Sequence, residues 1–459
     1  MTQTCFSQLP LAQSLLEGVA ALGFERMTPI QSQALPIALS GRDLIGQAKT
    51  GSGKTVAFAL GLLHRLQVER YRVQALVLCP TRELADQVAR EIRRLARQMH
   101  NVKVLTLCGG TPMGPQIASL EHGAHIIVGT PGRVDDHIRK GRLDLSEVAT
   151  LVLDEADRML DMGFAETLEA IVATTPDARQ TLLFSATFPR DIASLSERYL
   201  RTPARVSVDE PGDAHTIEQH FYSLNGLARA QAVERLLLHL RPERCVVFCN
   251  TKRDVKAMAQ TLEAVGFKVG ALHGDLEQRE RDITLALFAS HSLSVLVATD
   301  VAARGLDISG LDMVINADMA RESEVHVHRV GRTGRAGRKG LALSLVDERE
   351  THKFERLCDY SGLDANLESL PDLAAGVTAF RPPMVTLQLD GGRKQKVRPG
   401  DILGALTGAD GVAGEDVGKI HVFDFSACVA VRRKVVDEAL EKIRRDGLKG
   451  RRFRVRRIS

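Results

Sequence analysis

The segment Ala48-Lys49-Thr50-Gly51-Ser52-Gly53-Lys54-Thr55 decides the fold of the N-terminal part of this chain. It follows an apolar run over residues 43–46 that predicts a buried strand, and a helical pattern begins at Lys54. Backbone N–H groups in such a glycine-bearing turn lie at the positive end of a helix, where they bind phosphate oxygens. The segment therefore predicts a nucleotide site in which Lys54 reaches the terminal phosphates and Thr55 ligates magnesium.

A second strand pattern, over residues 150–153, ends in Asp154-Glu155-Ala156-Asp157. A carboxylate at the end of a buried strand is where the metal of a bound nucleotide can be held. We therefore predict that Asp154 is the partner of Mg²⁺ and that Glu155 orients and deprotonates the attacking water. Ala48 stands where the first glycine of the phosphate-loop pattern is usually written, which weakens the match. The acidic segment restores the interpretation, because the two motifs occur together. Together the two segments predict ATP and Mg²⁺ as ligands.

Length and composition are those of a soluble globular chain of about three domains, with 459 residues, 44% hydrophobic and 26% charged. No apolar run approaches the roughly twenty residues that span a bilayer, and the N-terminus lacks a basic segment followed by an apolar one. We therefore expect a cytoplasmic protein without a membrane partner. The seven cysteines show no paired spacings suited to zinc, which favours reduced structural thiols.

Positive charge is concentrated at the C-terminal end of the chain. Residues 383–459 contain 17 Lys and Arg against 10 Asp and Glu, whereas the whole chain carries a net charge of only +4. A small basic module on a nearly neutral body predicts attraction to a polyanion, most simply a nucleic acid. Solubility alone is the alternative explanation of this charge.

Strand patterns alternate with helical patterns twice along the chain, which is typical of parallel sheets covered by helices on both faces. The first set of expected strands comprises residues 43–46, 75–79, 125–129, 150–153 and 180–184, and the second comprises residues 245–249, 269–272, 294–298, 313–316 and 341–346. We expect two α/β domains, residues 1–208 and 216–365, joined by a linker over residues 209–215. A further linker, residues 366–382, precedes a C-terminal domain over residues 383–459 with the order βαββαβ of ferredoxin-like RNA-recognition modules.

The second α/β domain carries arginines where the first carries glycines. The segment His328-Arg329-Val330-Gly331-Arg332-Thr333-Gly334-Arg335 places three arginines within eight residues. Phosphoryl transfer spreads negative charge over oxygens that an arginine supplied across a cleft can stabilise. We predict that Arg332 and Arg335 play this part, whereas the alternative is the solvated start of a basic helix.

From about Phe6 to Val346 these motifs together resemble those of the DEAD-box RNA helicases. The resemblance implies two tandem RecA-like domains with doubly wound parallel sheets. It also implies that Phe24 stacks on adenine, that Gln31 hydrogen-bonds its edge with Thr28 in the same adenine-reading motif, and that Asp307 completes the nucleotide site. The phosphate-loop residues assigned to the nucleotide are Ala48, Lys49, Thr50, Gly51, Ser52, Gly53, Lys54 and Thr55, with Arg332 and Arg335 from the second domain.

The same resemblance assigns RNA-binding residues in both α/β domains. In the first domain they are Pro80, Thr81, Arg82, Gly110, Thr130, Pro131, Gly132 and Arg133, and in the second they are Thr251, Gly274, Gln278, Arg281, Thr299 and Arg304. Ser185, Thr187 and Asp300 match positions that couple hydrolysis to strand separation. Because such contacts go to phosphates and sugars, the core should bind RNA without regard to its sequence.

The C-terminal segments 391–394, 398–408 and 418–420 resemble the C-terminal domain of the DbpA subfamily. The resemblance implies recognition of a large-subunit ribosomal RNA hairpin, a pre-ribosomal particle as partner, and a role in ribosome assembly. The expected strand 427–431 lacks the aromatic pair that stacks on bases in RNA-recognition modules. We therefore expect cationic side chains to carry the contact with strong salt dependence, namely Arg393, Lys394, Lys396, Arg452 and Arg454.

The last strand alternates, with Arg452, Arg454 and Arg456 on one face and Phe453 and Val455 on the other. A charged strand that discourages edge pairing is the alternative to an RNA-binding role. For the whole chain we predict an ATP-dependent RNA helicase that acts as a monomer, in which RNA-stimulated ATP hydrolysis drives local duplex unwinding. A non-catalytic RNA clamp and a DNA helicase are the alternatives, and ATPase assays with RNA or DNA distinguish the three.

Overall fold

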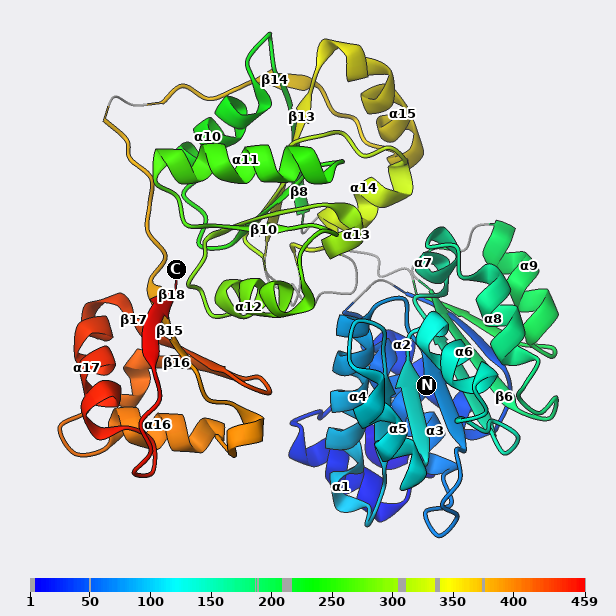
Figure 1. Ribbon diagram of the computed structural model, residues 1–459. Helices are drawn as coiled ribbons and strands as arrows, with labels where there is room; N and C mark the ends of the chain where they lie inside the picture. The colour runs from blue at the N-terminus through cyan, green and yellow to red at the C-terminus, as the bar shows by residue number, and fades with distance from the viewer. Residues whose placement is uncertain are drawn as a thin grey trace. The chain divides into compact units, whose positions relative to one another are not determined.

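The computed structural model describes residues 5–48, 51–185, 187, 190–208, 217–303, 311–334, 339–373 and 376–458. Five residues with predicted roles lie outside this part of the chain, namely Lys49, Thr50, Arg304, Asp307 and Arg335, and so does the expected linker 209–215. The chain forms two compact units that divide near residue 211. The first unit contains the first α/β domain, and the second contains the other α/β domain and the C-terminal domain (Figure 1).

The first domain is built on a parallel sheet with the order β3-β4-β2-β5-β6-β1-β7. Its strands are β1 (Leu44–Gln47), β2 (Ala75–Leu78), β3 (Val104–Leu107), β4 (Ile126–Gly129), β5 (Thr150–Asp154), β6 (Gln180–Ser185) and β7 (Ala204–Ser207). The helices are α1 (Gln13–Ala21), α2 (Pro29–Leu39), α3 (Lys54–His64), α4 (Arg82–Leu95), α5 (Met113–Glu121), α6 (Pro131–Arg139), α7 (Ala156–Asp161), α8 (Ala165–Val172) and α9 (Arg190–Tyr199).

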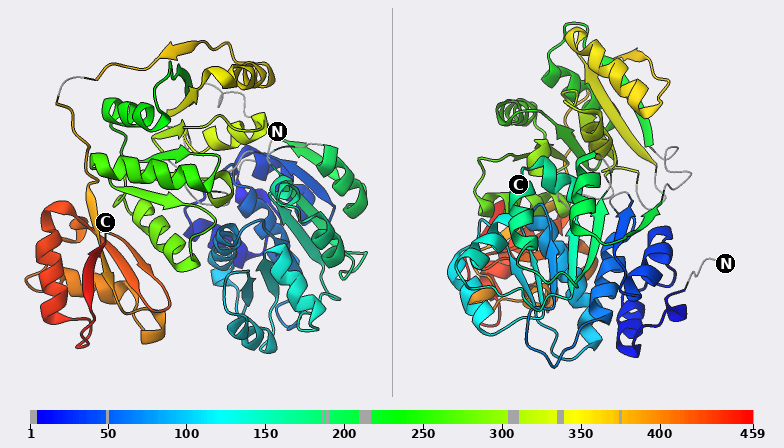
Figure 2. Two further views of the ribbon diagram at one scale, coloured as in Figure 1. Left: turned by 45° about the horizontal axis from the view of Figure 1, so that its top comes forward. Right: turned by 90° about the vertical axis from the view of Figure 1, so that its right-hand side faces the viewer.

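Helices cover both faces of this sheet (Figures 1 and 2). Val77 belongs to a core shared with α1 to α4, whereas its neighbours Leu76 and Leu78 belong to a core shared with α6 to α9. Successive side chains of a strand point to opposite faces, so a strand that is buried on both faces must be apolar throughout. The continuous apolar run of β2 is therefore explained by its place in the middle of the sheet.

The second domain repeats this architecture with the strand order β10-β11-β9-β12-β13-β8-β14, again entirely parallel. Its strands are β8 (Ile217–Ser223), β9 (Cys245–Phe248), β10 (Val269–Leu272), β11 (Val295–Ala298), β12 (Met313–Asn316), β13 (Gly340–Val346) and β14 (Leu367–Ser369). The helices are α10 (Arg229–Leu240), α11 (Lys252–Val265), α12 (Gln278–Ala289), α13 (Asp300–Ala303), α14 (Ser323–Val330) and α15 (Thr351–Ser361). The prediction of two parallel α/β domains is confirmed.

Four of these strands were not predicted from the sequence. Three of them, β3, β7 and β14, are edge strands, and β8 lies next to β14. Their residues are partly or fully exposed at many positions, so the continuous apolar run that marks a central strand is absent from them. Strand β14 lies within the expected linker 366–382, where the Glu368 carboxylate contacts His220 Nδ1 on β8 at 2.7 Å.

The C-terminal domain has the predicted order βαββαβ. Its elements are β15 (Met384–Leu389), α16 (Pro399–Thr407), β16 (Val417–Val422), β17 (Ala427–Arg432), α17 (Val436–Asp446) and β18 (Val455–Ile458). The antiparallel sheet has the order β16-β17-β15-β18, and its apolar face packs with α16 and α17. The last strand begins at Val455 rather than Arg452, because Leu448 and Arg451 pair in a tight turn just before it. In the part of the chain that the structure describes, every helix is too short or too polar to cross a membrane.

Candidate nucleotide and RNA sites

The predicted phosphate loop, the acidic strand end and the predicted coupling residue Ser185 lie at the ends of three neighbouring strands of the first sheet. The phosphate loop follows β1, Asp154 ends β5, and Ser185 ends β6, in the strand order β5-β6-β1. The carboxyl ends of parallel strands meet at one edge of a sheet, where ligands of α/β proteins bind. The fold therefore brings together residues that are up to about 130 positions apart in the sequence.

The phosphate loop uses a backbone conformation that favours glycine. Gly51 and Gly53 have φ values of 89° and 94°, and α3 begins directly afterwards at Lys54. The Lys54 side chain is buried, and its ammonium donates to the carbonyl of Ala48 at 2.6 Å. Lys54, the first residue of α3, thus binds the carbonyl at the start of the loop, and a helix N-terminus of this kind is where phosphate binds.

Gln31 connects the predicted adenine-reading segment to the phosphate loop. Its amide oxygen accepts from the backbone N–H of Thr28 at 2.9 Å, and its amide nitrogen donates to the carbonyl of Gly53 at 3.1 Å. A Cβ atom on Gly53 would lie 2.4 Å from that nitrogen, so only glycine permits the contact. Phe24, the predicted stacking residue, is half-buried and packs against the hydrophobic core that α1 to α4 form on one face of the sheet.

The acidic strand end has the electrostatics of a cation site. Burial raises the pKa of Asp154 to about 7, with repulsion from Glu155 adding to the effect and Lys54 opposing it. Glu155 adopts a left-handed backbone conformation with φ 51°, and its N–H donates to Asp154 Oδ1 at 3.0 Å. The buried Glu155 Oε2 lies 3.5 Å from Arg158 Nη1 and makes no hydrogen bond. The carboxylate of Asp154 and the hydroxyl of Thr55 are hard oxygen donors, which fit Mg²⁺.

Asp157 links this acidic segment to β6, and the sequence reasoning did not assign it a role. Its Oδ2 accepts from the backbone N–H of Thr187 at 3.0 Å and from the Thr187 hydroxyl at 2.9 Å. The Ser185 hydroxyl donates to the carbonyl of Thr187 at 2.6 Å. One predicted coupling residue, Thr187, is therefore bound to the acidic segment, and a second, Ser185, is bound to Thr187. The sequence could have indicated a role for Asp157, because it is the fourth residue of the acidic segment that begins at Asp154.

The predicted RNA-binding residues of the first domain follow β2, β3 and β4, which are neighbours in the order β3-β4-β2. Thr81 caps α4 by accepting from Leu84 N, and Thr130 accepts from Gly109 N at 3.4 Å. Arg133 Nη1 donates to the carbonyl of Thr111 at 3.1 Å. The loops after β3 and β4 are thus in contact with each other, and all three loops lie at the same sheet edge as the phosphate loop.

In the second domain the predicted RNA-binding loops also follow neighbouring strands. Gly274 follows β10, Thr299 follows β11 and Thr251 follows β9, in the order β10-β11-β9. Arg281 on α12 donates to the carbonyl of Ala302 at 2.7 Å, which joins α12 to the loop after β11. Arg332 follows α14 and is buried.

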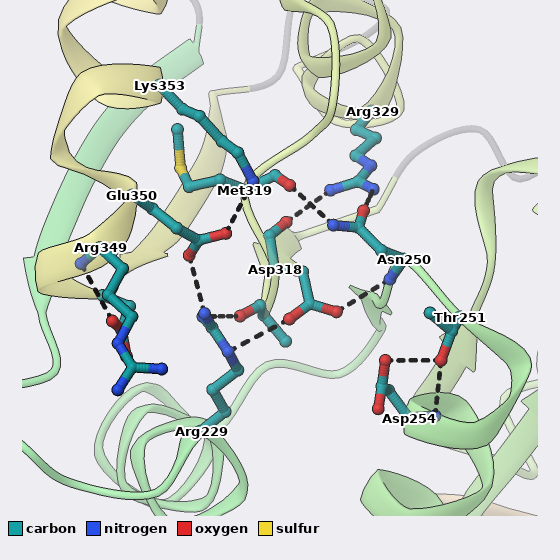
Figure 3. A network of polar contacts seen from close by, with 12 residues as sticks. Arg229, Asn250, Thr251, Asp254, Asp318, Met319, Arg329, Arg349, Glu350 and Lys353 are labelled. Carbon is teal, nitrogen blue, oxygen red and sulfur yellow. Dashed lines mark hydrogen bonds and ion pairs between the residues drawn. The ribbon is translucent and has the colours of Figure 1, made fainter.

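Arg329 lies at the centre of this edge, although the sequence reasoning chose Arg332 and Arg335 from the same segment. Its side chain is 2% exposed. All five N–H donors of the guanidinium are used: Nε and Nη2 bind the two oxygens of Asp300, Nη2 also binds Asn250 Oδ1, and Nη1 binds Asn316 Oδ1 and the carbonyl of Asp318. Arg329 therefore holds the loops after β9, β11 and β12 together, and part of this arrangement is drawn in Figure 3.

The basic loop of the C-terminal domain is fastened to the turn between β16 and β17. Arg393 N donates to the carbonyl of Phe423 at 2.8 Å, and Lys394 N donates to that of Asp424 at 2.9 Å. The predicted RNA-binding side chains of this domain are all exposed, namely Arg393, Lys394, Lys396, Arg452 and Arg454. The next turn residue, Phe425, is 65% exposed and was missed from the sequence because aromatics were sought only within the strands.

Fold and sites together define a class of protein. A phosphate loop and an acidic strand end in one RecA-like domain, an arginine-bearing second domain and a basic RNA-recognition-like module are the parts of an ATPase that acts on nucleic acid. Family models match in the same order along the chain. They are the DEAD/DEAH box helicase over residues 28–195, the helicase conserved C-terminal domain over residues 228–337 and the DbpA RNA binding domain over residues 386–457.

Individual proteins give the same result. The chain is 50% identical to the ATP-dependent RNA helicase DbpA of Escherichia coli over 454 residues, which cover 99% of each chain. It is 45% identical to the RNA helicase CshA of Bacillus cereus over 355 residues, which cover 77% of this chain and 67% of that protein. The structure of Saccharomyces cerevisiae Dbp5 bound to RNA and ADP BeF3 matches with a TM-score of 0.73 and 30% identity over 80% of this chain and 96% of that one. The chain therefore belongs to the DEAD-box ATP-dependent RNA helicases, which are ATP-hydrolysing enzymes, and carries the DbpA type of RNA-binding domain.

The contacts of Gln31 predict that its side chain stabilises the nucleotide-binding form of the phosphate loop. Gln31→Ala removes the bonds to Gly53 and Thr28, each of which contributes about 0.5–1.5 kcal/mol. We expect a roughly tenfold weaker affinity for ATP, measured by titration with a fluorescent ATP analogue. Gln33→Ala on the same helix is the control, and an equal loss in both variants would contradict the assignment.

Proposed function

We propose that this helicase separates short RNA duplexes through RNA-stimulated ATP hydrolysis, and that its C-terminal domain directs it to large-subunit ribosomal RNA. The observation that supports the first part is the row of strand ends in the first domain. The RNA-binding loops follow β3, β4 and β2, and the nucleotide residues follow β5, β6 and β1, without interruption in the strand order. Because β2 and β5 are neighbouring strands, the proposed RNA-binding loop after β2 lies next to the acidic segment that follows β5 in the strand order.

In the proposed reaction Lys54 and the loop amides bind the triphosphate, while Phe24, Thr28 and Gln31 form the adenine end of the site. Thr55 and Asp154 would hold Mg²⁺, which neutralises phosphate charge when bound. Glu155 would take the proton of the attacking water, since it directly follows Asp154 at the strand end and its buried Oε2 makes no hydrogen bond. From the remaining sequence assignments, Lys49, Thr50 and Asp307 would add nucleotide contacts.

Arginines of the second domain would stabilise the charge that develops on the phosphates. Arg332 and Arg335 are the proposed residues, and Arg329 positions the segment that carries them. RNA would bind to the loops after the strands of both domains through phosphates and 2′-hydroxyls, with Arg304 among the contacts. Ser185, Thr187 and Asp300 would transmit the state of the nucleotide, which is supported by the bonds of Thr187 to Asp157 and of Asp300 to Arg329.

Targeting to ribosomal RNA is supported by the resemblance of the C-terminal domain and by its charge. The exposed cations on the loop 393–396 and on the approach to β18 supply the attraction, and Phe425 supplies an aromatic surface on which a base can stack. We propose that the protein acts in the cytoplasm as a monomer on a pre-ribosomal particle. The proposal names the RNA that the C-terminal domain binds and leaves the ATPase mechanism of the two α/β domains unchanged.

Glu155→Gln tests the proposed hydrolytic role. Loss of a general base typically lowers the rate by about a hundredfold to ten thousandfold, so we expect RNA-stimulated ATPase activity to fall by at least a hundredfold. RNA binding in the presence of ATP should persist, because the substitution keeps the shape of the side chain. Glu166→Gln on α8, an exposed position, is the control.

The wild-type protein distinguishes the helicase from the alternatives in the same assay. Stimulation by RNA and not by DNA is expected of an RNA helicase. A turnover that RNA leaves unchanged would favour a passive clamp, and equal stimulation by DNA would favour a DNA helicase.

Phe425 and Arg393 should contribute to RNA binding in distinguishable ways. Phe425→Ala removes a stacking surface worth about 1–3 kcal/mol per base and should weaken binding of a large-subunit ribosomal RNA fragment by about fivefold or more at every salt concentration. Arg393→Gln removes a cation and should reduce the slope of log affinity against log salt by about 0.7–0.9. Fluorescence anisotropy across a salt series measures both quantities.

Phe425→Trp should restore the affinity, and Leu403→Ala, an exposed apolar position on α16, is the control. An unrelated RNA of the same length tests preference for ribosomal RNA. If Phe425→Ala changed the salt slope and left the affinity at low salt intact, the stacking role would be wrong.

A further inference from the structure

A chain of polar contacts extends from the Arg329 site to a residue outside every site assigned above. Figure 3 shows Arg229, the first residue of α10, directed toward Asp318 and Glu350. Arg229 Nε lies 3.2 Å from Asp318 Oδ1, Nη1 donates to the carbonyl of Ala317 at 2.7 Å, and Nη2 donates to Glu350 Oε2 at 2.7 Å. Lys353 binds the other oxygen of Glu350 at 3.1 Å. Two cations and two carboxylates therefore form a neutral group of four.

Asp318 connects Arg229 to Asn250, the residue that precedes the proposed RNA-binding Thr251. Its Oδ2 accepts from the backbone N–H of Asn250 at 2.8 Å, while Oδ1 faces Arg229. The Asn250 amide nitrogen donates to the carbonyl of Met319 at 2.9 Å. With its amide nitrogen so engaged, Asn250 presents its oxygen to Arg329 Nη2 at 2.8 Å. Backbone and side chain of Asn250 are thus both fixed by the segment that follows β12.

Asn250 lies between the two proposed ligand sites of this domain. It directly precedes Thr251, whose hydroxyl donates to Asp254 at the start of α11, and it binds the arginine three positions before Arg332. A shift of Asn250 would move the RNA-facing loop and disturb one of the five bonds of Arg329. The orientation of Asn250 depends on Asp318, and one oxygen of Asp318 is held by Arg229.

The location of Arg229 is unfavourable for the stability of its own helix. A cation in the first turn opposes the helix dipole, which favours anions at that end. Tertiary contacts with two carboxylates and a carbonyl must therefore account for an arginine at this position. The partner carboxylates are each only 14% exposed, so solvent screens these contacts less than those of a surface ion pair.

We propose that Arg229 is a positioning residue that couples RNA binding to nucleotide binding: through Asp318 it fixes Asn250, and thereby both the RNA-facing Thr251 and the guanidinium of Arg329. This inference rests on the proposed function, since it assumes that Thr251 contacts RNA and that the Arg329 segment acts on the nucleotide. It adds a residue from α10, and through Glu350 the start of α15, to the coupling apparatus.

The test measures coupling rather than activity alone. The affinity of the full-length protein for a labelled oligouridylate is determined with and without ADP and beryllium fluoride, and the ratio of the two affinities is the coupling factor. For Arg229→Gln we expect this ratio to fall about tenfold, which is within the usual range of coupling factors. Nucleotide affinity without RNA should change less than about twofold, because the phosphate loop belongs to the first domain and no bond of Arg229 reaches it.

Controls separate positioning from simple stabilisation. Arg229→Lys keeps the charge and should restore most of the ratio, whereas Arg235→Gln makes the same replacement on another face of α10 and should leave it unchanged. Glu350→Gln leaves the contact between Arg229 and Asp318 in place and should give a smaller loss in the same direction, so the inference can be tested even if Arg229→Gln does not fold. Combining Arg229→Gln with Asn250→Ala should give less than the product of the two single losses, because both act on one chain of contacts.

Two results would overturn the inference. One is an unchanged ratio in folded Arg229→Gln. The other is a variant in which the RNA affinities with and without nucleotide both fall, the melting temperature falls with them, and Arg229→Lys does not recover either affinity. That is the behaviour of a contact that only stabilises the fold. Failure of the proposed function is recognised separately, since wild-type protein would then lack RNA-stimulated ATPase activity and a coupling factor above one.

Discussion

The carboxyl ends of parallel strands lie at one edge of a sheet, and this constraint organises the whole helicase core. Each strand interior is buried on both faces and must be apolar, so polar side chains that bind ligands are confined to the loops that follow the strands. In the first domain six consecutive strand ends precede the loops that are predicted to bind RNA and nucleotide. Within the predicted nucleotide group, the bonds of Thr187 to Asp157 and of Gln31 to Gly53 join segments that lie far apart in the sequence.

The second domain uses the same edge for a different purpose. Its centre is a buried guanidinium, and burying an unpaired charge is so costly that every N–H group of Arg329 must find an acceptor. Those acceptors come from the loops after β9, β11 and β12, which cannot move independently while the arginine is bound. A fully satisfied network of this kind rigidifies the loops and specifies one arrangement of them. The outer group around Arg229 extends that rigidity to α10 and α15.

Strand β17 of the C-terminal domain has no aromatic residues on which RNA bases could stack. Gly392 allows the basic loop to approach the β16–β17 turn, since a Cβ atom there would lie 2.3 Å from the carbonyl of Phe423. The close approach places exposed cations beside Phe425, so electrostatic attraction and a stacking surface occur in one small region. A fixed backbone lowers the entropy that RNA binding would otherwise have to overcome.

Sequence alone determined the class of each domain, the phosphate loop, the acidic strand end and the order βαββαβ, because apolar periodicity and glycine-bearing turns are local properties of the chain. It did not reveal β3, β7, β8 and β14, since these strands are partly exposed and lack the continuous apolar run of a strand buried on both faces. It also indicated that the segment 328–335 with its three arginines is functional, but it assigned roles to Arg332 and Arg335 and none to Arg329. Which arginine binds Asp300 depends on the side of α14 that faces the strand ends and on the strand order β11-β9-β12, which places Asp300, Asn250 and Asp318 around it. Only the tertiary structure decides these contacts, because they join residues whose separation in the sequence carries no information about their distance in space.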